Sequence, residues 1–89
     1  METNIHQIQV FPNPISTNAT FRLTSKENTY VDFSIYNVKG QKIITIYSGD
    51  IVRNEKEFNF NSGNLPNGIY FMKAISNKQV ATKKILIIH

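Results

Sequence analysis

The stretch LPNGIYFMK, residues 65–73, joins a tight turn to a strand. Pro66 fixes φ at the second position of a turn, and Asn67 and Gly68 tolerate the left-handed backbone that a sharp reversal needs. Large side chains then alternate along the stretch, which is typical of a strand that is buried on one face. In β-sandwiches a tyrosine at the start of a late strand often hydrogen-bonds to the backbone a few residues upstream. We predict that Tyr70 is such a tyrosine.

Outward from this stretch, the chain consists of short alternating runs separated by turn residues. Strands are predicted at residues 5–11, 20–24, 30–38, 43–47, 58–60, 69–75 and 79–89. Turns are predicted at residues 12–14, 26–28, 37–41, 49–50, 61–64 and 76–78, where proline, glycine, asparagine or charged residues cluster. No helical period persists. We therefore predict an all-β fold, an immunoglobulin-like antiparallel β-sandwich of about seven strands.

Several runs carry more specific expectations. In residues 30–38 the odd-numbered apolar side chains should face the core, while Asp32 and Ser34 face water. Residues 43–47 are apolar at neighbouring positions, which predicts contact on both faces or a bulge. Residues 58–60 should form only a short strand.

Length and composition limit the alternatives. With 89 residues, the chain is predicted to be one domain, residues 1–89, with a thin margin of stability. Hydrophobic residues make up 40%, and cysteine is absent, so a core is expected without disulfides or a thiolate metal site. Residues 1–7 have neither the basic nor the apolar region of a signal peptide. No apolar run approaches the roughly 20 residues of a spanning helix, so direct membrane insertion is not expected.

Charge is distributed unevenly along the chain. The net charge is +4, all six acidic residues precede Phe58, and every charged residue after it is a lysine. This single-sign field could steer association with an acidic partner or an anionic surface, or it could simply be a solvated face. The four apolar residues at 85–88 should be covered on both faces of the last strand.

The residues that could carry chemistry do not form a convincing set. His6 and His89 lie near opposite ends without the spacing of a zinc site. Glu55 and Glu57 share a strand face but are expected to be exposed, where no special pKa arises. Hence neither a catalytic nor a metal site is predicted, and no cofactor.

Two binding functions are also disfavoured. A calcium site could combine Asp32 and Asp50 with Asn61 or Asn64, but the spacing is not that of a calcium-binding loop. A nucleic-acid surface would interleave aromatic residues with lysines on an exposed face. Phe21, Phe33, Phe58 and Phe60 instead alternate with polar residues as core positions do, so no nucleic-acid partner is predicted.

Three motifs together resemble the C-terminal sorting domain of type IX secretion substrates from Bacteroidetes-type bacteria. They are VFPNP at residues 10–14, IYNVKGQK at 35–42, and LPNGIYFMK at 65–73 followed by TKKILII at 82–88. Each is weak alone, but their order and spacing cover nearly the whole chain.

The resemblance implies a protein transport signal at the end of a longer secreted protein, with a covalently linked cargo upstream. Such a domain passes through the periplasm and is read by type IX outer-membrane translocon, shuttle and sortase-like proteins. A sortase-like protease usually removes it, and the cargo becomes secreted or displayed on the cell surface. Recognition would use strand addition or a complementary surface rather than catalysis.

From these motifs we predict a recognition surface. Its residues are Pro12, Asn13, Pro14, Gly68, Tyr70, Lys73, Lys83, Lys84, Ile85 and Ile87. The competing hypothesis is a passive immunoglobulin- or fibronectin-like module that binds carbohydrate or protein at the cell surface. Such a module should carry an exposed aromatic platform or a ligand site on its loops.

Overall fold

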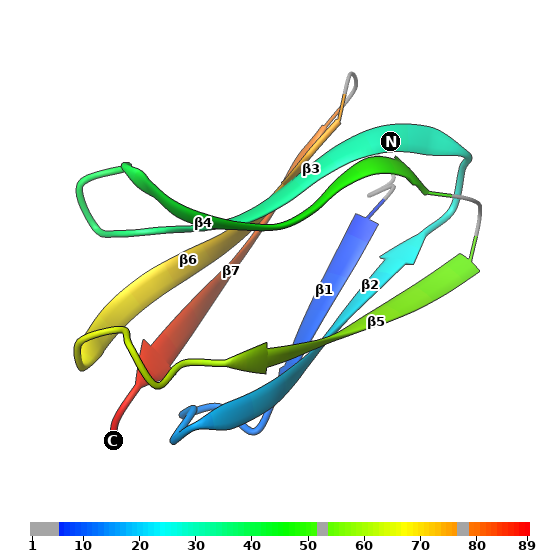
Figure 1. The fold of residues 1–89 in the computed structure, drawn as a ribbon. Coiled ribbons are helices and arrows are strands. Elements are labelled where there is room, and N and C mark those ends of the chain that lie inside the picture. Colours follow the sequence, from blue (N-terminus) through cyan, green and yellow to red (C-terminus); the bar gives the residue numbers. More distant parts are fainter. Residues whose placement is uncertain (1–5, 52–53, 77–78) are drawn as a thin grey trace.

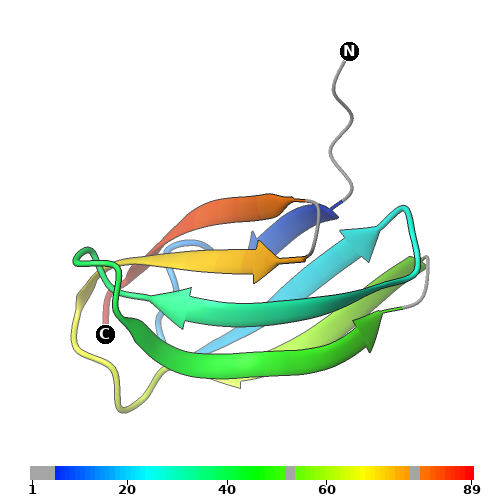
Figure 2. The ribbon, with the colours of Figure 1, turned by 90° about the horizontal axis from the view of Figure 1, so that it is seen from above.

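Two antiparallel β-sheets pack face to face in the computed structural model, which describes residues 6–51, 54–76 and 79–89 (Figure 1). The strands are β1 (His6–Phe11), β2 (Asn18–Ser25), β3 (Thr29–Tyr36), β4 (Lys42–Ile51), β5 (Asn54–Asn61), β6 (Gly68–Ile75) and β7 (Val80–Ile87). The three-stranded sheet has the order β1-β2-β5, and the four-stranded sheet the order β4-β3-β6-β7, which can be followed by colour in Figure 2. The predicted all-β sandwich is confirmed.

The core lies between the sheets and is built from alternate side chains of each strand. Phe21 of β2 is fully buried, stacks on Phe60 at 5.1 Å between ring centroids and meets Phe33 edge-on at 6.2 Å. Such aromatic pairs add about 0.5–1.5 kcal/mol each beyond the area that they bury. Phe58 is half-buried against the same core. The expectation that Phe21, Phe33, Phe58 and Phe60 occupy core positions is therefore confirmed.

The predicted turn at Gly49-Asp50 is wrong, because both residues lie inside β4 and pair with β3. The ring of Tyr47 lies across Gly49. Its hydroxyl oxygen is 3.1 Å from the position that a Cβ would take if residue 49 had a side chain. That hydroxyl donates a hydrogen bond to the carbonyl of Asp50 at 2.6 Å. The glycine therefore makes room for a side chain within a strand instead of reversing the chain.

The predicted irregularity of residues 43–47 is confirmed. The pairing of β3 with β4 shifts register between Phe33 and Ser34, and again between Ile35 and Tyr36. The first shift leaves Ile46 without a cross-strand partner, and the second leaves Ile43 without one. β4 therefore bends along its length, as bulged strands do.

Strand β5 is longer than the short strand predicted at residues 58–60. It pairs with β2 over its whole length, from Asn18 opposite Asn61 to Ser25 opposite Asn54. Its polar first half forms a strand because the neighbouring strand supplies partners, which the isolated segment does not reveal.

Two expectations about burial are also wrong. Ser34 lies on the outer face of β3 but is fully buried, since it is flanked by Thr45 and Lys73 on the adjacent strands and bonds to Asp32. At the end of the chain, Ile85 and Ile87 are fully buried but Ile88 is 48% exposed. The last strand is therefore covered on its inner face more completely than on its outer one.

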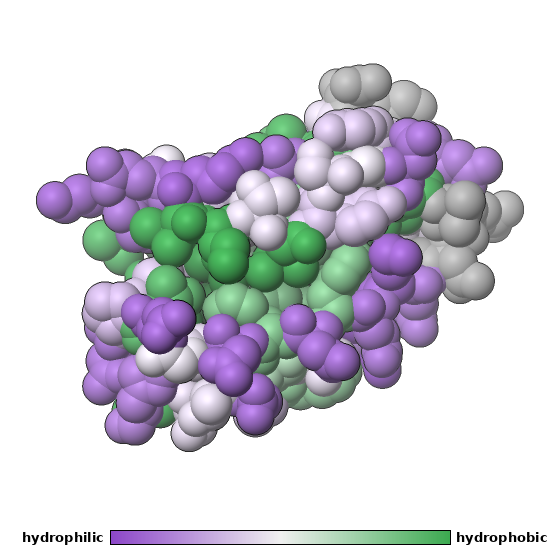
Figure 3. Space-filling model, in the orientation of Figure 1, coloured by the Kyte–Doolittle hydropathy of each residue, from purple (hydrophilic) through white to green (hydrophobic). Residues whose placement is uncertain are grey.

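The sandwich shows apolar side chains along the side bounded by β4 and β5 (Figure 3). Ile46, Tyr47, Phe58 and Leu65 are among the partly buried apolar residues that pack against the core. Among the residues that the structure describes, no helix has the length and apolar character needed to cross a membrane.

Candidate functional site

The tyrosine that the sequence singles out anchors the start of β6. Tyr70 is 7% exposed, and its hydroxyl donates a hydrogen bond to the carbonyl of Pro66 at 2.7 Å. This confirms the predicted tyrosine corner. Gly68, two residues earlier, has φ +155°, and a Cβ added there would meet no atom within 4 Å. Glycine is thus required by the backbone conformation and not by lack of space.

The proline motif near the start of the chain lies on the edge of the last strand. The side chain of Asn13 accepts a hydrogen bond from the Leu86 amide at 3.2 Å and donates one to the Lys84 carbonyl at 3.4 Å. The peptide bonds that precede Pro12 and Pro14 are cis. The side chain of Asn13 therefore pairs with the edge of β7 as the backbone of a neighbouring strand would.

Ile15 continues this pairing with its own backbone. Its amide donates to the Leu86 carbonyl at 2.8 Å, and the Ile88 amide donates to the Ile15 carbonyl at 2.9 Å. Ile15 itself is fully buried and forms an isolated parallel bridge with Ile87. Residues 13–15 therefore act as a short extra strand that closes one end of the β7 edge.

The last residue is held by the turn that precedes β6. The amide of His89 donates to the side-chain oxygen of Asn67 at 3.0 Å, and its ring Nε2 lies 2.7 Å from the Leu65 carbonyl oxygen. Figures 1 and 2 both show the C-terminus beside this turn. The first and the last of the three motifs thus meet at one end of the sandwich.

The middle motif lies at the same end of the four-stranded sheet. Its turn is closed by Asn37, whose backbone accepts from Gly40 and whose side-chain oxygen accepts from the amides of Lys39 and Gln41. Tyr36 pairs with Phe71 near the start of β6, so this hairpin is close to the tyrosine corner. We call the end of the sandwich formed by residues 12–15, 35–42, 65–71 and 84–89 the motif end.

The three lysines of the predicted surface do not form one patch. Lys73 lies on the outer face of the four-stranded sheet, with Nζ 4.9 Å from the centroid of the Tyr36 ring. Lys84 is on the same face, opposite Phe71. Lys83 points to the other side of β7 and lines a mostly polar groove of about 490 Å³ between β1 and β7.

The remaining predicted residues divide by exposure. Pro12, Asn13 and Pro14 are exposed, and Gly68 is half-buried. Tyr70, Ile85 and Ile87 lie in the core, where a partner could reach them only if the strand moved. Their role in recognition stays a prediction, and the contact that each makes is structural.

Sequence reasoning missed Ile15, Asn67 and His89, which complete the motif end. The sequence gives His89 no role beyond the lack of zinc-site spacing, and nothing in the local sequence indicates its contacts with the turn. A signal for Ile15 did exist, because it is a lone apolar residue directly after two prolines in a polar segment.

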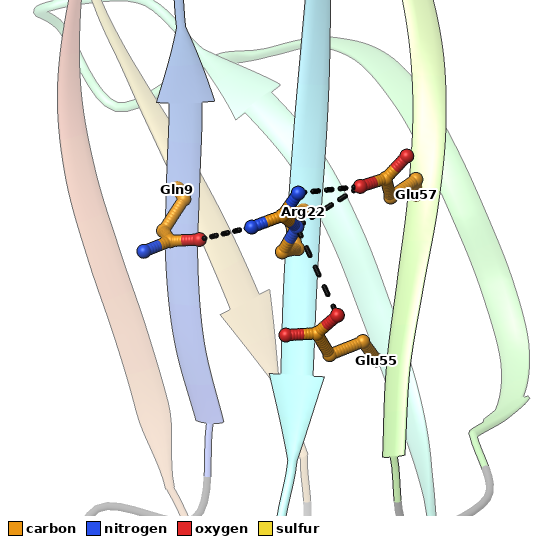
Figure 4. Close-up of polar contacts among 4 residues, drawn as sticks. All are labelled: Gln9, Arg22, Glu55 and Glu57. Atoms are coloured by element: carbon orange, nitrogen blue, oxygen red, sulfur yellow. Dashed lines mark hydrogen bonds and ion pairs between the residues drawn. The ribbon is translucent and has the colours of Figure 1, made fainter.

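One group of paired charges lies away from the motif end. On the outer face of the three-stranded sheet, Arg22 donates to Glu57 at 2.8 and 3.0 Å and to Gln9 at 3.2 Å, and Glu55 lies 3.9 Å away (Figure 4). The hydrogen bonds that Arg22 donates to Glu57 raise the pKa of Arg22. The two glutamates that share this strand face are thus held next to a cation, in a structural arrangement.

A second ion pair lies on the four-stranded sheet. Hydrogen bonds from Ser34 and then Lys42 hold the pKa of Asp32 below its ordinary value, and Asp32 in turn raises the pKa of Lys42. Asp32 therefore has a cation and a hydroxyl as partners, while Asn61, considered with it for calcium, lies in the other sheet. Within the described ranges, no group of three or more histidine, cysteine, aspartate or glutamate side chains could hold a metal ion.

Comparison with known families identifies the domain. A family model described as "Secretion system C-terminal sorting domain" matches residues 9–88. The chain belongs to the family of type IX secretion C-terminal sorting domains. The match spans all the elements of the motif end except His89.

The fold of this sorting domain is shared with a solved structure. It superimposes with a TM-score of 0.74 on the crystal structure of dimeric latent PorU from Porphyromonas gingivalis, over 99% of this chain at 18% identity. The chain spans 10% of the length of that protein. None of the curated proteins matches the sorting domain.

Proposed function

We propose that this domain is the address label of a longer secreted protein and directs a covalently linked upstream cargo through the type IX system. The cargo crosses the periplasm, and the label is read at the outer membrane by translocon and shuttle proteins. A sortase-like protease then removes the label, and the cargo is released or displayed on the cell surface. The label itself is not an enzyme.

The observation that carries this proposal is the family match over residues 9–88, supported by the meeting of the family's motifs at one end of the fold. A fixed surface favours recognition, because a shape that is ordered before binding loses less conformational entropy on binding than one that the partner must order. The contacts among Asn13, Leu86, Asn67 and His89 supply that rigidity at the motif end.

The edge of β7 supports strand addition as the way in which a partner recognises the label. Leu86 and Ile88 direct backbone groups away from β6, toward Asn13 and Ile15. Because alternate residues of an antiparallel strand direct their backbone groups to the same side, Thr82 does so as well. No described residue pairs with Thr82 on that side. β1 lies beside this part of β7 across the groove lined by residues 7–9 and 79–83, so a partner strand that enters the groove can pair with β7 there.

A fusion experiment tests the label. Residues 1–89 are placed behind a periplasmic reporter in a strain with a working type IX system, with a second fusion that lacks residues 83–89. We expect surface delivery of the intact fusion and its loss on truncation. Failure of the intact fusion to reach the surface refutes the proposal.

Substitutions at Thr82 separate strand addition from the label itself. Thr82→Pro removes an amide that faces outward from an edge strand, a position where proline is tolerated. Thr82→Ala keeps that amide and is the matched control. We expect Thr82→Pro to abolish delivery at a nearly unchanged melting temperature, while Thr82→Ala is delivered. Normal delivery of both variants rejects strand addition at this edge and leaves the label function standing.

Two lysine variants test whether charge contributes. Lys84→Ala alters the outer face of β7, and Lys26→Ala is the control, since Lys26 is exposed in the turn at the opposite end of β3. We expect weaker delivery for Lys84→Ala only, and a smaller further loss at high salt than in wild type, because the attraction that salt screens is already reduced. Equal delivery for both variants would show that the charge at Lys84 is only a solvated face.

A further inference from the structure

A hollow of about 460 Å³ lies on the outer face of the three-stranded sheet, away from the β7 edge. Its size falls in the range of sites for small ligands. The lining includes Phe11, Pro12, Asn18, Thr20, Asn59 and Asn61. The register places Phe11, Thr20 and Asn59 in one row across the three strands, and Asn18 beside Asn61 in the next.

The ring of Phe11 is the apolar part of this hollow. Phe11 is 41% exposed, although it belongs to a strand whose neighbouring apolar residues pack against the core. The guanidinium carbon of Arg22 lies 5.2 Å from the centroid of its ring. Arg22 is in turn fixed by Gln9 and Glu57, as Figure 4 shows. The phenyl ring therefore lies on the outer surface of the sheet, where Arg22 holds it and a ligand can contact it.

The polar part consists of side chains that the fold does not use. Asn18, Thr20 and Asn59 make no side-chain hydrogen bond to any residue in the described ranges. Asn61 accepts one bond from the Gly63 amide at 2.8 Å through its side-chain oxygen, which leaves its NH₂ group unused. Asparagine is depleted in strands, so three of them together on a strand face are not explained by strand formation.

The chemistry of the lining selects a neutral ligand rich in hydroxyl groups. No ionisable side chain lines the hollow, so it offers no specific site for a charged group. β2 is paired on both sides, by β1 and β5, so along β2 the sheet face presents only side chains and no free backbone. Amides and a hydroxyl supply donors and acceptors for sugar hydroxyls, and a phenyl ring packs on the apolar C–H face of a sugar ring.

We propose that this hollow binds a neutral glycan, with Phe11 against a sugar ring and Asn18, Asn59 and Asn61 on its hydroxyl groups. It provides the aromatic platform expected of a carbohydrate-binding module, on a domain that also belongs to the sorting family. The site shares Pro12 with the motif end but includes no residue of β7, so it goes beyond the sorting function and can fail without affecting it.

Titration of the purified domain tests the site. The probes are the neutral hexasaccharides of maltose, cellulose, mannan and laminarin type, added to about 10 mM and followed by amide chemical shifts in NMR. We expect at least one to bind with a Kd of about 1 mM or below, with shifts centred on residues 11, 18–20 and 59–61. Two further probes are a hexagalacturonate, which is acidic, and an uncharged peptide of serine and glycine.

Three variants decide the outcome. Phe11→Ala should weaken binding at least about tenfold and Asn59→Ala about threefold to tenfold, both with unchanged far-UV circular dichroism. Tyr30→Ala is the control, because Tyr30 is 53% exposed but lies on the other sheet. The proposal is overturned if no neutral saccharide binds, if the acidic saccharide or the peptide binds as well as any neutral one, or if Phe11→Ala and Asn59→Ala bind like wild type.

Discussion

Replacement of Tyr70 by phenylalanine should destabilise the domain by about 1 kcal/mol. The change removes the 2.7 Å hydrogen bond to the Pro66 carbonyl and leaves the buried ring in place. A buried hydrogen bond of this kind contributes about 0.5–1.5 kcal/mol net. Because Pro66 is exposed, its carbonyl can bond to water in the variant, and no further desolvation penalty is expected. For a domain of this length, the corresponding fall in melting temperature is about 4–8 °C.

The assay is urea unfolding followed by far-UV circular dichroism, since the chain has no tryptophan and the substitution removes one of its four tyrosines. Tyr30→Phe is the matched control. Its hydroxyl lies 2.6 Å from the Ser48 hydroxyl, but the residue is 53% exposed, so its loss should change stability by less than about 0.5 kcal/mol. If Tyr70→Phe is no more destabilising than Tyr30→Phe, the corner does not anchor β6 and this reasoning is refuted.

Three other predictions concern stability. Gly68→Ala should cost about 1–3 kcal/mol through its backbone conformation alone, measured by the same urea titration, and a change near zero would show that φ relaxes. Ile87→Ala should cost about 2–5 kcal/mol, and the half-exposed Ile88→Ala serves as its control. The folded-state pKa of Asp32 lies below its ordinary value of 3.8, so its stabilising effect is complete above that pH and is lost as pH falls through the folded pKa. Below about pH 4 the unfolding midpoint should therefore fall more steeply for wild type than for Asp32→Asn; parallel curves would contradict this.

The strands and the core could be predicted where the sequence alternates. Phe33 and Ile35 lie on the buried face of β3 because a strand that covers a core must place apolar residues at every second position. The tyrosine corner could be predicted for a similar reason, since its donor and acceptor are only four residues apart. Features of this kind depend on residues that are close together in the sequence, so the sequence is enough to predict them.

Features that depend on a neighbouring strand could not be predicted. The Gly49-Asp50 pair has the composition of a turn, and only the packing of Tyr47 across the glycine explains its place in β4. The polar start of β5 likewise becomes a strand because Arg22 on the neighbouring strand bonds to Glu57. In both cases a partner overrides the local propensity, as is common in sheets.

The motifs of the candidate site could be read from the sequence, but their meeting could not. Asn13 bonds to backbone groups 71 and 73 residues further along the chain. No local rule connects a proline motif to a strand at that separation. The aromatic and amide groups of the hollow were missed for the same reason, because three strands bring Phe11, Thr20 and Asn59 into one row.

The arrangement at the motif end affects how sorting mutants must be interpreted. Asn13 and Tyr70 each hold a segment that contacts β7 or precedes its partner β6, so their loss can abolish sorting by loosening the fold. Thr82 and Lys84 are exposed on the same strand, and their side chains hold no other element. A secretion defect in a Thr82 or Lys84 variant of unchanged stability indicates a loss of recognition by the secretion machinery and not a loosened fold. Recognition is therefore best tested at Thr82 and Lys84, and the rigidity of the motif end is best tested by unfolding.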